Sequence, residues 1–173
     1  MNTPQPSTPE IIAAIIQKFA DLPNRLGAKK GDGDGAWTRQ IKEDIGSLGV
    51  AHGWTVCSSG FERRFEPEWL YDLIWYRNDG QKHLEDVYLV LESEWREDKD
   101  HYAVRYDFEK LLIAKATLKV MVFQAWDVDI AELFEFLERG IRAFKKGSAD
   151  ETYLLVGFNN NRDAFDVRQI RGA

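Results

Sequence analysis

The spacing of hydrophobic positions along the chain predicts four helices. Four segments have apolar residues every three to four positions, the period of an amphipathic helix: 9–28, 37–52, 103–116 and 129–146. The first segment also has a helix-start signal, because Thr8 suits the N-cap position and Pro9 suits the first helical position.

Other stretches have the spacing of strands. The segments concerned are 54–61, 70–77, 87–95, 118–126, 152–158 and a last one that includes Phe165, Val167 and Ile170. In the first three, alternation with a period of two indicates strands with one buried face. The runs that start at 118 and at 152 are almost continuously apolar, which is typical of strands buried on both faces.

The order of these elements indicates an α/β protein with a mixed sheet. Two helices come first, three strands follow in succession, and the remaining order is helix, strand, helix, strand, strand. The three consecutive strands are expected to pair mostly antiparallel, with a tight turn at 78–80 (Asn-Asp-Gly). The helix between the third and fourth strands implies a crossover connection, which is expected to be right-handed.

The length of the chain and the positions of its Pro- and Gly-rich segments predict one domain. A chain of 173 residues suits a single core, and no internal repeat is found in it. Residues 1–8 contain Pro4 and Pro6 and are expected to form a flexible tail, which leaves 9–173 as the domain. The glycine-rich run at 31–35 predicts a flexible break between the first two helices.

Composition and charge restrict the class of protein. No apolar run approaches the ~18 residues of a membrane span, and residues 1–10 lack the features of a secretory signal. A cytoplasmic protein without membrane association is therefore expected. The net charge of −6 and the pI near 5.2 argue against a wide nonspecific DNA-binding surface. They leave room for a local basic patch beside an acidic, metal-binding pocket.

Three acidic residues near strand ends are the strongest candidates for chemistry. Asp72 interrupts an otherwise apolar strand, and Glu92 and Glu94 lie two residues apart on one face of the next strand. Converging carboxylates repel one another unless a cation or a proton lies between them, and hard oxygen ligands suit Mg²⁺ or Mn²⁺. A solvated strand face with ordinary alternating acids is the other interpretation of the same spacing.

Together with the element order, these acids resemble the PD-(D/E)XK nuclease superfamily, which has the restriction-endonuclease-like fold. The resemblance covers about residues 37–126. It rests on Asp72 in YDLIW, on Glu92 and Glu94 in LVLESEW, and on YDFEKLLIAKATLKVMVF at 106–123. It implies an αβββαβ core, to which this chain adds an N-terminal helix and a C-terminal helix and strands. It also implies a metal-dependent phosphodiester hydrolase as the activity.

The resemblance implies a metal site. Asp72 would correspond to the metal-binding aspartate of the second strand, and Glu92 to the acidic residue of the third. Glu43, on the first core helix, matches a position where members often have a further acid. The cofactor implied by these three residues is Mg²⁺ or Mn²⁺.

The chain departs from the superfamily at Glu94. Members usually have a lysine there, which positions the attacking water or stabilises the developing charge. Some members have Glu or Gln instead, and in others the lysine moves to the neighbouring helix. On that helix Lys110 is the first candidate and Lys115 the second. Lys110 also suits an ordinary solvated pair with Asp107, one helical turn earlier.

Two functions stay open at this point. In the first, the chain is a Mg²⁺-dependent nuclease acting on DNA or RNA, with Glu94 or Lys110 orienting or activating the water. In the second, it keeps the fold without turnover and acts as a binding or regulatory module. The missing lysine at position 94, the small size and the acidic charge favour the second. A homodimer is consistent with the resemblance, and a protein partner or self-association through Trp69 and Tyr71 also stays open.

Overall fold

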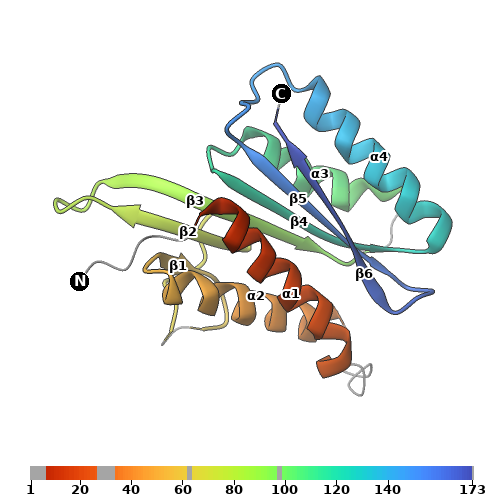
Figure 1. Ribbon diagram of the computed structural model, residues 1–173, viewed down its shortest axis with the longest axis horizontal. Helices are drawn as coiled ribbons and strands as arrows, with labels where there is room; N and C mark the ends of the chain where they lie inside the picture. The colour runs from red at the N-terminus through yellow and green to blue at the C-terminus, as the bar shows by residue number, and fades with distance from the viewer. Residues whose placement is uncertain (1–6, 27–33, 62–63, 97–98, 173) are drawn as a thin grey trace.

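The chain forms a mixed β-sheet with helices on both faces (Figure 1). The computed structural model describes residues 7–26, 34–61, 64–96 and 99–172. Most of the expected tail at 1–8 and of the expected break at 31–35 lie outside these residues. The α/β class predicted from the sequence is confirmed, whereas the narrower nuclease-like core stays a prediction.

The helices and strands occur in the predicted order. The helices are α1 (Thr8–Leu26), α2 (Asp34–Ala51), α3 (Tyr102–Ile113) and α4 (Asp127–Ala143), and a 3₁₀ turn at Lys99–His101 leads into α3. The strands are β1 (Thr55–Cys57), β2 (Leu73–Asn78), β3 (Leu84–Glu94), β4 (Leu118–Ala125), β5 (Thr152–Asn159) and β6 (Ala164–Arg171). Hydrophobic spacing therefore predicted the type and the approximate place of the four helices and six strands, but not the 3₁₀ turn.

The strands lie in the sheet in their chain order, from β1 to β6. β1, β2 and β3 pair antiparallel, as their succession along the chain predicted. β3 pairs with β4 in parallel, with α3 as the crossover, and β4 pairs with β5 in parallel, with α4 between them. β6 is antiparallel to β5. The C-terminal ends of β3, β4 and β5 therefore lie at one end of the sheet, together with the start of β2.

The first two strands are shorter than predicted, and both differences affect the surroundings of Asp72. β1 stops before Ser58, whose backbone N–H turns to pair with the carbonyl of Glu66 (3.0 Å). β2 begins at Leu73, because Leu70 has a left-handed backbone conformation (φ 64°) that interrupts the strand. Asp72 therefore precedes β2, at a strand end that other side chains can reach.

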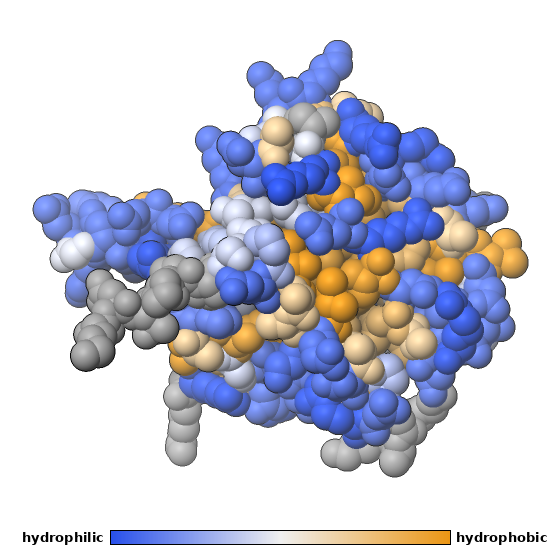
Figure 2. Space-filling view, viewed as in Figure 1, coloured by the Kyte–Doolittle hydropathy of each residue, from blue (hydrophilic) through white to orange (hydrophobic). Residues whose placement is uncertain are grey.

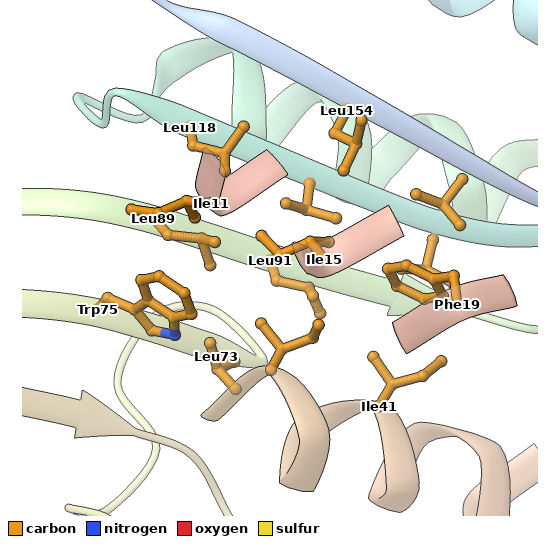
Figure 3. Packing of buried hydrophobic residues seen from close by; sticks show 14 of the residues in the cluster. Ile11, Ile15, Phe19, Ile41, Leu73, Trp75, Leu89, Leu91, Leu118 and Leu154 are labelled. Atoms are coloured by element: carbon orange, nitrogen blue, oxygen red, sulfur yellow. The ribbon is translucent and has the colours of Figure 1, made fainter. Parts of the chain in front are cut away.

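Both faces of the sheet are buried. Figure 3 shows Ile11, Ile15 and Phe19 of α1 packed over the strands, in the same cluster as Leu91 and Leu118. A second cluster fills the space between the opposite face and the helices α3 and α4. Burial of each large apolar side chain stabilises the fold by about 1.5–3 kcal/mol. The sheet is thus a rigid platform for side chains at its ends.

Two glycines let α2 pack closely against its neighbours, Gly49 against the sheet and Gly46 against the segment between β1 and β2. A Cβ atom at Gly49 would lie 2.6 Å from the indole of Trp75, and one at Gly46 would lie 2.4 Å from the ring of Phe65. Lys42 precedes these glycines by one and by two turns, so it lies on the same side of the helix. The glycines therefore bring a lysine to the end of the sheet.

The face that carries α1 and α2 has a polar rim and a hydrophobic middle (Figure 2). Several partly buried hydrophobic side chains pack against the cluster that contains Ile11, Ile15 and Phe19. They are Ile16, Trp37, Leu48, Phe61, Phe165 and Val167. Among the described helices, none is long and apolar enough to cross a membrane.

Candidate functional site

Asp72 and Glu92 are neighbours because of the antiparallel register of β2 and β3. Leu73 is the partner of Leu91 in this register, so the residue before β2 lies beside the residue after Leu91. The Oδ2 atom of Asp72 accepts a hydrogen bond from the backbone N–H of Ser93 (2.8 Å). The structure therefore brings together two of the three acids that were predicted as metal ligands.

Glu92 is buried against α3, where Lys110 is its counter-ion. Glu92 is 3% exposed. Lys110 Nζ lies 2.5 Å from Glu92 Oε1 and 3.1 Å from Asp107 Oδ1, and the lysine side chain is 32% exposed. The hydroxyl of Tyr71 donates to the carbonyl of Lys110 (3.4 Å), which ties α3 to the segment before β2. The first lysine candidate on this helix therefore reaches the pair of acids.

These charges shift the pKa values within the cluster. Burial raises the pKa of Glu92 to about 8; Lys110 acts against this rise, and the carboxylates of Asp72 and Asp107 add to it. Burial alone would lower the pKa of the Lys110 ammonium, but its contacts with Glu92 and Asp107 raise it above its ordinary value. A buried acid with a raised pKa, beside a specific charged partner, is typical of functional sites.

A second lysine, Lys42 of α2, reaches Asp72. Its Nζ lies 3.2 Å from Asp72 Oδ1, 2.8 Å from Glu68 Oε2 and 3.1 Å from Ser59 Oγ, and its side chain is 7% exposed. Burial alone would lower the pKa of Lys42, but the contacts with Glu68 and Asp72 raise it. Sequence reasoning missed this residue, because a lysine on a helix suggests a solvated face. Its spacing from the two close-packed glycines of α2 was the available signal.

Three other predicted residues have different surroundings. Glu43 Oε1 lies 2.9 Å from the guanidinium of Arg64, and its side chain is 41% exposed. Glu94 accepts a hydrogen bond from the backbone N–H of Arg96 (2.7 Å) and forms an ion pair with the guanidinium of the same residue. Lys115 follows the end of α3 and is exposed. The two glutamates are thus drawn toward arginines rather than toward Asp72 and Glu92.

The donor set suits a hard cation with few protein ligands. Within the described residues, no group of three or more His, Cys, Asp or Glu side chains is placed to hold a metal ion. Mg²⁺ is nevertheless commonly bound by one or two carboxylates and several waters, and Asp72 and Glu92 supply two. Glu92 Oε1 is buried, and in the described part of the chain it accepts no hydrogen bond of good geometry. The positive partner of this oxygen is the Lys110 ammonium at 2.5 Å, so a metal ion would bind here in place of that ammonium.

The interpretation of this site rests on its own geometry. No protein-family model, curated protein or solved structure matches the chain. What supports a function is therefore the arrangement itself: two adjacent carboxylates at strand ends, and two lysines that reach them from helices on opposite faces of the sheet.

Proposed function

We propose that the chain is a Mg²⁺- or Mn²⁺-dependent phosphodiester hydrolase of the PD-(D/E)XK type, acting on DNA or RNA. The observation that carries this proposal is the contact between Lys110 and Glu92, beside Asp72. The resemblance calls for two acids at the ends of neighbouring strands and a lysine that has moved to the next helix. Asp72, Glu92 and Lys110 meet that requirement in both residue type and position.

Each residue of the cluster has its own task in this proposal. When bound, the metal would supply Lewis acidity at a phosphoryl oxygen and a more acidic water. Asp72 and Glu92 would hold the cation, and the N–H of Ser93 orients the Asp72 carboxylate. Lys110 is partly exposed, so its ammonium can orient the attacking water or face the charge that develops on the phosphate. Glu94 is already paired and leaves this task to Lys110.

We expect divalent metal to raise the melting temperature of the native chain. A ligand that binds the folded state stabilises it by about 2.7 kcal/mol at a hundredfold excess over Kd. Thermal melts with Mg²⁺ and with Mn²⁺ test this on the native chain and on Asp72→Ala/Glu92→Ala. The double variant should lose the rise in Tm, whereas Glu43→Gln should keep it, because Glu43 binds Arg64 instead.

A native chain whose Tm stays constant in millimolar metal would contradict the proposal. A rise that survives in the double variant would place the metal elsewhere. If the rise depends on the two acids, hydrolysis of labelled DNA and RNA oligonucleotides is the next measurement, with Lys110→Met expected to bind metal and to lack turnover.

Exposed aromatic rings near Lys110 support nucleic acid as the substrate. Tyr102 and Tyr106 precede Lys110 by two turns and one turn on α3, and they are 65% and 58% exposed. Their rings stack on each other with centroids 6.4 Å apart. Unpaired bases stack on rings of this kind, with about 1–3 kcal/mol per base. The tyrosine pair therefore offers a surface for single-stranded nucleic acid beside the proposed site.

Tyr102→Ala/Tyr106→Ala is expected to weaken the binding of a single-stranded oligonucleotide at least about fivefold, the low end of the stacking energy. Fluorescence anisotropy in EDTA measures this without hydrolysis. Tyr102→Phe/Tyr106→Phe keeps the rings and should bind like the native chain. Equal affinities for all three proteins would show that bases do not stack on this pair.

A non-catalytic binding module is the second candidate function, and one observation favours it. Both candidate ligands already have a lysine partner, Lys42 on Asp72 and Lys110 on Glu92. In such a module the two ammonium groups take the place of the metal. A native chain that binds oligonucleotide, yet has the same Tm with and without metal, would support this function instead of the hydrolase.

A further inference from the structure

Lys42 is the more deeply buried of the two lysines at the site. Its side chain is 7% exposed, against 32% for Lys110. Lys42 Nζ, Glu68 Oε2 and Ser59 Oγ contact one another at 2.7 to 3.1 Å, so they form a closed set of hydrogen bonds. Asp72 is the third partner of this ammonium, at 3.2 Å. The position of the charge is thus determined by more than its contact with Asp72.

We propose that Lys42 is a fixed internal counter-ion that sets the affinity of the site for a divalent cation. This inference rests on the proposed function, because it concerns the metal that Asp72 and Glu92 would hold. Glu68 and Ser59 keep their contacts with Lys42 when the Asp72 carboxylate turns toward a metal. The ammonium therefore stays a few ångströms from a ligand oxygen and repels the incoming cation.

Lys110 has a different part in the same site. Its side chain is partly exposed, so the ammonium can move away from Glu92 toward solvent or substrate when a metal arrives. Lys42 has no such route, since it lies between α2 and the start of β2 and is almost completely buried. Lys42 is accordingly a positioning residue, whereas Lys110 is the lysine that a substrate can touch.

Removal of the Lys42 charge is expected to tighten the binding of Mn²⁺ at least about tenfold, because charges this close repel strongly even at an effective dielectric constant near 20. Binding of Mn²⁺ alone is measured by electron paramagnetic resonance of the free ion, without substrate or turnover. The variants are Lys42→Met and Lys42→Gln. The glutamine variant keeps a donor for Glu68 and Ser59 and serves if the methionine variant does not fold.

Two controls separate the local charge from other effects. Lys145→Met removes the same charge from an exposed position after α4, so it tests the effect of net charge and should leave the Mn²⁺ affinity unchanged. Lys42→Arg keeps the positive charge and should bind Mn²⁺ no tighter than the native chain. Circular dichroism of each variant shows whether it is folded.

The outcomes distinguish this inference from the proposed function. If the native chain binds Mn²⁺ and the uncharged Lys42 variants bind it more tightly, the inference and the proposed function are both supported. If only the uncharged variants bind Mn²⁺, the inference is supported and the proposed function of the native chain is wrong. If the native chain binds Mn²⁺ through Asp72 and Glu92 and the uncharged variants bind equally or more weakly, the inference is wrong and the proposed function stands. If no folded protein of the set binds millimolar Mn²⁺, both are wrong.

Discussion

Replacement of Glu151 by alanine is expected to lower the free energy of unfolding by about 3–5 kcal/mol. Lys119 on β4 is fully buried, and its Nζ lies 2.8 Å from Glu151 Oε2 and 3.0 Å from the hydroxyl of Tyr153. Without Glu151, the partners of this ammonium among the described residues are the Tyr153 hydroxyl and the carbonyl of Leu112, at 3.5 Å. A desolvated charge is then left without an opposite charge, which is the costly result of breaking a buried ion pair.

Urea denaturation measures this loss, with Lys119→Met/Glu151→Leu as the matched control. The double variant removes both charges and leaves the buried Tyr153 hydroxyl without these two partners, so it should lose less stability than Glu151→Ala. An equal loss in both proteins would show that Glu151 acts through packing and not through charge.

The pH dependence of the stability of Glu151→Ala gives a second test of the buried Lys119 charge. Burial lowers the pKa of Lys119 below its ordinary value of 10.5, even though Glu151 opposes this. Without Glu151 the pKa should fall further, so the native state loses a proton that the unfolded state still holds. Stability of the variant should therefore recover as the pH rises toward 10.5.

Glu92→Gln is expected to be more stable than the native chain at alkaline pH. Burial raises the pKa of Glu92 from 4.5 to about 8; Lys110 opposes the rise, and Asp72 and Asp107 add to it. The folded state therefore holds a proton that the unfolded state releases, and stability falls as the pH rises between about 4.5 and about 8. The cost is roughly 3–5 kcal/mol over this range, and a neutral amide does not incur it.

Melting temperatures from about pH 5 to about pH 9 test this expectation. The difference in Tm between Glu92→Gln and the native chain should grow by roughly 6–20 °C over the range. Lys110 and Tyr71 also face Glu92, but their pKa values are raised above 10, so they add no slope here. Glu94→Gln is the control variant. It removes a carboxylate two residues further along β3, so it shows the effect of net charge without the burial of Glu92. A difference that is constant with pH would contradict a buried Glu92 that keeps its proton.

The elements of this fold could be predicted because burial leaves a local periodicity in the sequence. The apolar run at 118–126 is β4, and the helical spacing at 129–146 is α4, each to within a few residues. The errors occur where backbone conformation overrides side-chain pattern. At Leu70 the residue pattern suggested a strand, but a positive φ delays β2 until Leu73.

The candidate site could be predicted in part. Alternation along the third strand predicted Glu92 and Glu94 on one face, and the family resemblance implied Lys110 on the helix that follows. The register that makes Asp72 a neighbour of Glu92 is a property of the paired strands and has no local signal around the predicted turn. The sequence could also not show that Glu43, one residue after Lys42, faces Arg64 while Lys42 faces Asp72.

By itself, the sequence determined which segments are helices and strands, their order, the class of the fold and a short set of candidate residues. The tertiary structure decided which acids and lysines meet. Lys42 and Lys119 look like ordinary solvated lysines in the sequence, yet both are buried with carboxylates that lie far away along the chain. Apolar burial repeats every turn or every second residue and is therefore encoded locally. The partner of a buried charge is determined only when packing of the helices on the sheet brings distant segments together.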